Sequence, residues 1–161
     1  MVENKKLKVY LDTSVISYLM QTDAPERMVK TLQLWEKLKK GTYDVCLSQV
    51  TLTEISKCDI AKFNFLLEKL AEIDYMTYEL NDEVYRLANE VIEKGILTEK
   101  SYDDCTHIAV AVINNCDVIV SWNFKHMVNI KTIKGIRTIT NLKGYSAIEI
   151  MTPETLLEME V

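Results

Sequence analysis

Residues 7–20 read LKVYLDTSVISYLM, and this stretch decides which kind of fold the chain can adopt. A short apolar run from Leu7 to Leu11 ends at the carboxylate of Asp12, and a polar turn then leads into a second apolar run from Val15. Short and nearly continuous apolar runs are typical of strands buried on both faces, as in parallel sheets. We therefore predict a buried strand that presents Asp12 at its carboxyl end.

The same alternation of strands and helices continues along the chain. Further strands are predicted at Tyr43–Ser48, Ile73–Thr77, Val118–Ser121, Ile136–Thr140 and Ala147–Met151. Helices are predicted from Pro25 to Gly41, over Thr51–Ser56 with Thr51 as N-cap, over Phe63–Leu70, from Asn81 to Gly95, from Ser101 to Ile113 and after Pro153. Strands that alternate with helices predict an α/β fold whose parallel sheet is covered on both faces. The length and the absence of a linker predict one domain over residues 1–161.

Composition excludes several classes of protein. The longest apolar run, Ile108 to Ile113, is far shorter than the roughly 20 residues that a membrane-spanning helix needs. The N-terminal segment lacks the apolar stretch of a signal peptide, so we expect a cytoplasmic protein. The four cysteines form no CxxC pair, which indicates reduced thiols rather than a zinc site. The net charge of −5 argues against a protein that binds nucleic acid by electrostatic attraction alone.

Polar residues follow the predicted strands at the edge where an α/β sheet binds its ligands. Asp12 follows the first strand, Glu54 comes soon after the second, Asp104 opens a helix, and Asn123 follows the strand at Val118–Ser121. Converging carboxylates repel one another unless a cation or protons neutralise them. Oxygen ligands suit hard cations, so we predict a Mg²⁺ or Mn²⁺ site.

Each of these side chains also has a purely structural interpretation. Asp12 could be only a helix N-cap, and Asn123 could cap the segment that begins at Phe124. Glu54 could pair with Thr51 in a capping box, and Asp104 could stabilise the N-terminal end of its helix.

Two neighbours of Asp104 also have structural interpretations. We expect Asp103 to be solvated or to support the site only indirectly, because adjacent helical residues point in different directions. We expect His107 to be a packed, hydrogen-bonded core residue.

Four segments together resemble the motifs of the PIN-domain family. They occur in the family's order and are VYLDTSVISYL at 9–19, SQVTLTEI at 48–55, DDCTHIAVAV at 103–112 and CDVIVSWNFKHM at 116–127. In the last motif the family usually has aspartate where this chain has Asn123. Asparagine offers a carbonyl oxygen but no charge, so a second metal site should be weaker.

The resemblance implies a three-layer α/β/α sandwich with a mostly parallel central sheet. It also implies an endoribonuclease that hydrolyses RNA phosphodiester bonds with Mg²⁺ or Mn²⁺. Asp12, Glu54 and Asp104 would then bind the metal, and Asn123 would position a metal water or a second ion. Many bacterial and archaeal members are VapC-type toxins held in check by an antitoxin. An antitoxin partner and a homodimer are therefore expected, with contacts on the helices between the first and third acids.

Two other functions compete with this one. The fold could be a catalytically weakened module that binds nucleic acid or protein, which Asn123 and the acidic net charge favour. It could also be an unrelated metal-dependent phosphohydrolase for small phosphate esters. Against the latter, the chain has no glycine-rich phosphate loop, and Asp12 has no second aspartate two residues on.

Overall fold

The computed structural model describes residues 5–159. Its strands are β1 (Lys8–Leu11), β2 (Asp44–Ser48), β3 (Met76–Tyr78), β4 (Val118–Val120) and β5 (Glu149–Met151). Its α-helices are α1 (Thr13–Ser17), α2 (Pro25–Lys39), α3 (Gln49–Ile55), α4 (Ile60–Leu70), α5 (Asp82–Glu93), α6 (Tyr102–Ile113), α7 (Ile130–Lys143) and α8 (Pro153–Glu158). Short 3₁₀ helices, η1 (Tyr18–Met20) and η2 (Glu99–Ser101), follow α1 and precede α6.

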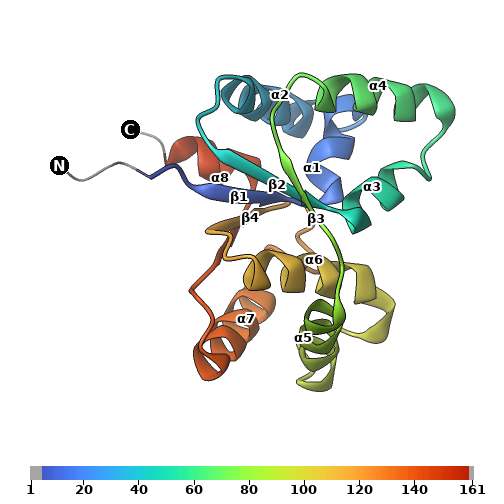
Figure 1. Cartoon of the computed structure of the whole chain (residues 1–161). Coiled ribbons are helices and arrows are strands. Elements are labelled where there is room, and N and C mark those ends of the chain that lie inside the picture. Colours follow the sequence, from blue (N-terminus) through green and yellow to red (C-terminus); the bar gives the residue numbers. More distant parts are fainter. Residues whose placement is uncertain (1–4, 160–161) are drawn as a thin grey trace.

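The strands form one parallel sheet in the order β3-β2-β1-β4-β5, with β1 at its centre. Figure 1 shows α1, α2, α3, α4 and α8 on one face of this sheet and α5, α6 and α7 on the other. The predicted α/β/α arrangement is therefore confirmed. Because every neighbouring pair is parallel, the carboxyl ends of all strands lie along the same edge.

Alternate residues of β1 point into two separate cores. Val9 and Leu11 pack into the core beneath α1, α2 and α4, whereas Tyr10 packs into the core formed with α5, α6 and α7. All three side chains are buried. This follows from the two-residue period of a strand that has helices on both sides.

Helix α6 crosses the second core and is apolar nearly all round. Every residue from Cys105 to Val112 is buried, and α5 packs along it. Helix α5 instead has one apolar stripe, in which Val84, Leu87, Ala88 and Val91 are buried. Burial on several sides explains why α6 lacks a polar face. The same helix carries Asp104 in its first turn.

The strand predicted at Ile136–Thr140 is wrong, because these residues lie inside α7. The segment is rich in β-branched isoleucine and threonine, which favour strands. Ile136 and Ile139 are spaced three apart, however, and both are buried on one helical face. Asn129 caps this helix at its start, and Gly144 ends it in the left-handed conformation with φ 78°. The last strand of the sheet is instead β5, which lies within the predicted segment Ala147–Met151.

One predicted helix cap is also corrected. The helix that carries Glu54 begins earlier than expected, and its N-cap is Ser48, whose hydroxyl accepts the Val50 N–H. Thr51 lies inside the helix and is buried, so it forms no capping box with Glu54. Ser48 is the N-cap because it is the last residue of β2 and the helix begins at the next residue.

Other sequence predictions hold. Pro25 is the first residue of α2, and Asn81 caps α5 by accepting the Val84 N–H. Cys46, Cys58, Cys105 and Cys116 are free thiols. Over residues 5–159, no helix combines the length and the apolar character that a bilayer crossing requires.

Candidate functional site

The candidate residues come together at the carboxyl edge of the sheet. Asp12 directly follows β1, and Ser121 directly follows the neighbouring strand β4. On the other side of β1, strand β2 ends at Ser48 and leads into α3, which carries Glu54. Helix α6 contributes Asp104 from its first turn. Adjacent parallel strands thus bring residues about one hundred positions apart to the same place.

Asp12 is buried, with 3% of its surface exposed. Its carboxylate accepts hydrogen bonds from the hydroxyls of Ser14 (2.5 Å) and Ser121, and from the backbone N–H of Val15 (3.4 Å). The N-cap interpretation is therefore correct, although it accounts for only one of these bonds. Burial raises the pKa of Asp12 above its ordinary value, because the hydrogen bonds and the nearby His107 offset only part of the desolvation.

Glu54 is bound to a buried histidine. Its Oε1 lies 2.6 Å from Nε2 of His107 and accepts a hydrogen bond from Oγ1 of Thr13 at 2.8 Å. On its other side, His107 contacts the hydroxyl of Tyr10 at 2.6 Å, and that hydroxyl lies 2.7 Å from the Ser48 hydroxyl. Burial alone would raise the pKa of Glu54, but His107 and Thr13 hold it below its ordinary value. His107 is thus a core residue, as predicted, and also a partner of the site.

Asp104 has a second histidine as its partner. Its Oδ2 lies 2.9 Å from Nδ1 of His126, and the side-chain amide of Asn123 is 3.5 Å from the same oxygen. The Asn123 Oδ1 accepts the backbone N–H of His126 at 3.0 Å, so it closes the turn after β4. Burial raises the pKa of Asp104, while His107 and His126 oppose the rise.

The three acids interact through the charge of His107. Burial alone would lower the pKa of this histidine, but the carboxylates of Glu54, Asp12 and Asp104 together raise it above its ordinary value. A cationic ring surrounded by acids is therefore favoured here. It supplies part of the positive charge required by the buried Asp12 and the partly exposed Glu54 and Asp104.

The donor set fits a hard divalent cation by its chemistry, since it consists of three carboxylates and one amide. The acids are held by their protein partners, however. Among the residues that the structure describes, no three histidine, cysteine, aspartate or glutamate side chains are placed so that they could hold one ion together. The site therefore contains suitable metal ligands, but in this structure their oxygens are hydrogen-bonded to protein side chains.

Some contacts of the site could not be recognised in the sequence. The pairs His126–Asp104 and Tyr10–His107 join segments far apart in the chain, and no local pattern signals them. By contrast, Ser14 stands two residues after Asp12, where side-chain bonding is common near a helix start. Asp103 is exposed, as predicted for a residue one position away from Asp104.

Comparison with known proteins gives a family and two structural neighbours. The PIN domain model matches residues 9–124, whereas no curated protein matches the chain. The structure of VapBC2 from Rickettsia felis bound to a promoter DNA fragment is similar with a TM-score of 0.55 and 16% identity, covering 91% of this chain and 98% of that one. VapC20 from Mycobacterium tuberculosis, described as a sarcin-ricin loop cleaving toxin, has a TM-score of 0.57 and 14% identity, covering 87% and 98%.

At these identities the neighbours support the fold, and the family assignment rests on the match to the PIN model. That match spans all four sequence motifs up to Phe124 and includes each candidate acid. The chain belongs to the PIN domain family.

Proposed function

We propose that this protein is a divalent-metal-dependent endoribonuclease and the toxin of a toxin–antitoxin pair. The proposal rests mainly on Asp12, a buried carboxylate whose hydrogen-bond donors are two hydroxyls and one backbone N–H. Two further acids, Glu54 and Asp104, interact with the same His107 at the same edge of the sheet. A cluster of like charges that the fold compensates only in part is typical of a functional site. RNA as substrate also implies a cytoplasmic location.

Asp12, Glu54 and Asp104 would hold the metal, which we expect to be Mg²⁺ or Mn²⁺. The chemistry that such a cation supplies is activation of water and neutralisation of charge on the phosphate. The hydroxyls of Ser14 and Ser121 would keep Asp12 in one orientation. To share an ion, Glu54 and Asp104 would exchange their histidine contacts for it.

His126, released from Asp104, would then be able to contact the RNA. It is about one third exposed, and its ring faces Asp104 across the turn that Asn123 closes. A histidine beside the scissile phosphate could donate a hydrogen bond to a phosphate oxygen. Asn123 would position Asp104 through its amide group rather than bind metal strongly, since its own carbonyl oxygen already accepts a backbone N–H.

We also propose a homodimer, with contacts on the helices between the first and third acids. Ile60 and Leu67 of α4 are 77% and 42% exposed, and their spacing of seven places them on one face of the helix. Replacing both by glutamate should convert a dimer to a monomer in light scattering without changing the circular dichroism spectrum. The antitoxin would be a separate chain, by analogy with the VapBC complex from Rickettsia felis.

Cleavage of RNA by the purified protein tests the proposed activity. We expect single-stranded RNA to be cut in Mg²⁺ or Mn²⁺ and to stay intact in excess chelator. The neighbouring residues of α6 provide a matched pair. Asp104→Asn should abolish cleavage, whereas Asp103→Asn, which changes an exposed acid in the same helical turn, should leave it unchanged. RNA that stays intact with both metals, or equal activity in the two variants, would refute the proposal.

One observation favours a second candidate, a PIN module that binds RNA without cutting it. The acids are engaged by protein side chains, and Asn123 replaces the family's fourth acid. This candidate predicts that the protein binds single-stranded RNA with the same affinity in metal and in chelator, and that no product forms. The same cleavage assay, combined with a binding assay, separates the two.

A further inference from the structure

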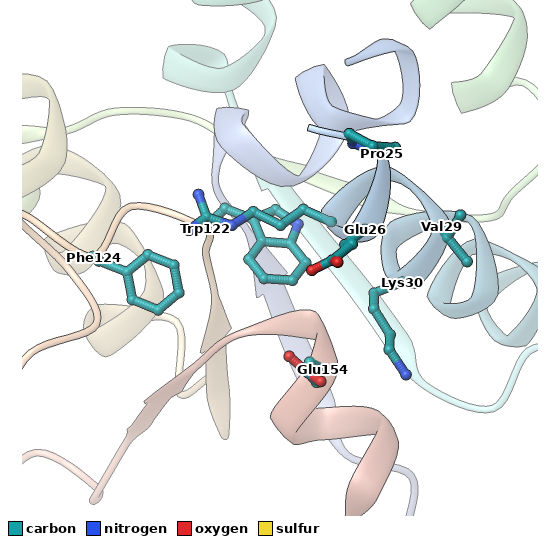
Figure 2. Close-up of a pocket in the computed structure, with 8 residues that line it drawn as sticks. Pro25, Glu26, Val29, Lys30, Trp122, Phe124 and Glu154 are labelled. Carbon is teal, nitrogen blue, oxygen red and sulfur yellow. The ribbon is translucent and has the colours of Figure 1, made fainter. Parts of the chain in front are cut away.

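A hollow of about 570 Å³ lies beside the candidate site, between α2, the turn after β4, and α8. Figure 2 shows the side chains around it. They are Pro25, Glu26, Arg27, Val29, Lys30, Trp122, Phe124 and Glu154. Its size is within the range of cavities that hold small organic ligands, about 300–1,000 Å³. None of the roles proposed above uses it.

One wall of this cavity is aromatic. The rings of Trp122 and Phe124 lie 6.4 Å apart and are tilted by 54°. Trp122 is buried and fixed, because its indole N–H donates to Oγ1 of Thr31 at 2.8 Å. Phe124 is 44% exposed, and the guanidinium of Arg27 lies 4.8 Å from its ring centre. A flat exposed ring with an arginine above it is the kind of surface on which unpaired nucleobases stack.

The charges around the cavity favour a base over a phosphate. Arg27 and Lys30 are balanced by Glu26 and Glu154, so an anion would gain no net attraction. Figure 2 shows the carboxylates of Glu26 and Glu154 among the side chains that line the cavity together with Trp122. Carboxylate oxygens accept hydrogen bonds, and the amino groups of nucleobases donate them. A neutral planar group with donors on its edge therefore suits this cavity.

The cavity is joined to the acid cluster by a direct chain of contacts. The backbone N–H of Trp122 donates to Oγ of Ser14 at 2.9 Å, and that hydroxyl donates to Asp12 at 2.5 Å. Phe124 directly follows Asn123. A ribonucleotide chain with a phosphate at Asp12 would therefore place a neighbouring nucleotide next to the aromatic wall.

We propose that this cavity is a subsite for one unpaired nucleobase of the RNA, stacked on Phe124 beside Arg27. The inference rests on the proposed function, and it narrows the substrate to RNA that is single-stranded near the cut. Duplex RNA could not use the subsite, because its bases are already stacked and paired.

Fluorescence anisotropy with a labelled single-stranded RNA of about 12 nucleotides tests this subsite. The Asp12→Asn variant serves as the parent, so that the RNA is not cut during the titration. Adding Phe124→Ala should raise Kd roughly 5- to 150-fold, which is the loss expected for one stacked base. Phe124→Leu should give a similar loss, since leucine keeps apolar contact but has no flat ring. The matched control is Tyr85→Ala on α5, because Tyr85 is similarly exposed at 40% and lies outside the cavity.

The inference is supported if both Phe124 variants weaken binding to the single strand while Tyr85→Ala and duplex binding are unchanged. It is overturned if the Phe124 variants bind single-stranded RNA as the parent does. It is also overturned if duplex binding weakens equally. Cleavage by the protein with Asp12 intact is measured separately. If the Phe124 variants bind single-stranded RNA more weakly but the protein with Asp12 intact does not cleave RNA, only the proposed nuclease is refuted. If that protein cleaves RNA but the Phe124 variants bind RNA as tightly as the parent, only the subsite is refuted.

Discussion

The charged side chains at the two ends of strand β1 differ in their partners and in their burial. At the amino end, the Lys8 ammonium donates to the backbone oxygen of Asn114 at 2.6 Å, and the Lys8 N–H donates to the Asp117 carboxylate at 2.8 Å. At the carboxyl end, Asp12 is buried near two more acids. At the amino end a cation and an acid are each bound to backbone groups near the surface. At the carboxyl end a buried carboxylate lies near two partly exposed ones.

We infer from this difference that the Lys8 end of the strand contributes to stability and the Asp12 end to function. The contacts of Lys8 lower the free energy of the fold, because they satisfy groups that remain partly in water. The cluster at Asp12 raises it, because desolvated carboxylates are compensated only in part. Sites that depart from the most stable arrangement are where function is expected.

The largest effect should come from paired changes of one acid at each end. Asp12→Asn should lower the rate of RNA cleavage at least about 1,000-fold, because metal stabilisation of the transition state is worth several kcal/mol. Asp117→Asn should leave the rate unchanged, since asparagine can still accept the Lys8 N–H. Single-turnover cleavage of labelled RNA measures both. Equal loss in the two variants would show that the ends do not differ in function.

A smaller effect should follow from Asn123→Asp, which adds a fourth acid to the carboxyl end. The new carboxylate can still accept the His126 N–H, and it adds a negative charge close to Asp104. We expect roughly tenfold less Mn²⁺ to be needed for half-maximal cleavage, because an added charge strengthens cation binding. A metal titration of the cleavage rate checks this. An unchanged or higher metal requirement would place Asn123 outside the metal's reach.

The effect of Asp12→Asn on the stability of the folded protein should depend on pH. The pKa of Asp12 is raised on folding, so ionising it in the native state costs free energy as pH rises above its ordinary value of 3.8. In metal-free buffer at pH 7, Asp12→Asn should therefore be more stable than the unchanged protein. A gain of 1 kcal/mol would raise Tm by roughly 2–4 °C.

The sign of this effect provides its control. Below pH 3.8 the carboxyl is protonated in both the folded and the unfolded chain, so the advantage of Asp12→Asn should vanish as the pH approaches 4. Thermal unfolding at several pH values measures the difference. A variant that is less stable at pH 7 would mean that the hydrogen bonds of Asp12 outweigh its desolvation.

The smallest effect is expected at the amino end. Lys8→Met removes the ammonium contact with Asn114 and the contact with the Tyr78 ring, whose centre lies 5.0 Å away. We expect a loss of about 0.5–1 kcal/mol in the free energy of unfolding, measured in urea, because the side chain is only partly buried. Cleavage should be unchanged. A drop in cleavage without a drop in stability would contradict the assignment of this end to structure alone.

Much of the fold and the location of the site could be predicted from local sequence. The buried strands are short apolar runs, and a polar residue follows directly where the chain leaves the sheet, as at Asp12 and Ser121. The strand prediction at Ile136–Thr140 is wrong because β-branched isoleucine and threonine favour strands in a short segment, and only packing against the rest of the protein makes it helical. The histidine partners were not predictable, because Glu54 and His107 meet only after α3 and α6 have packed together.

The central claim is that Asp12, Glu54 and Asp104 share one divalent cation. Titration of Mn²⁺ into the protein, followed by electron paramagnetic resonance of the free ion, tests it without RNA. The account predicts saturable binding that is lost in each of Asp12→Asn, Glu54→Gln and Asp104→Asn and is kept in Asp103→Asn. Binding that survives any one of the first three changes, or no saturable binding at all, would contradict it.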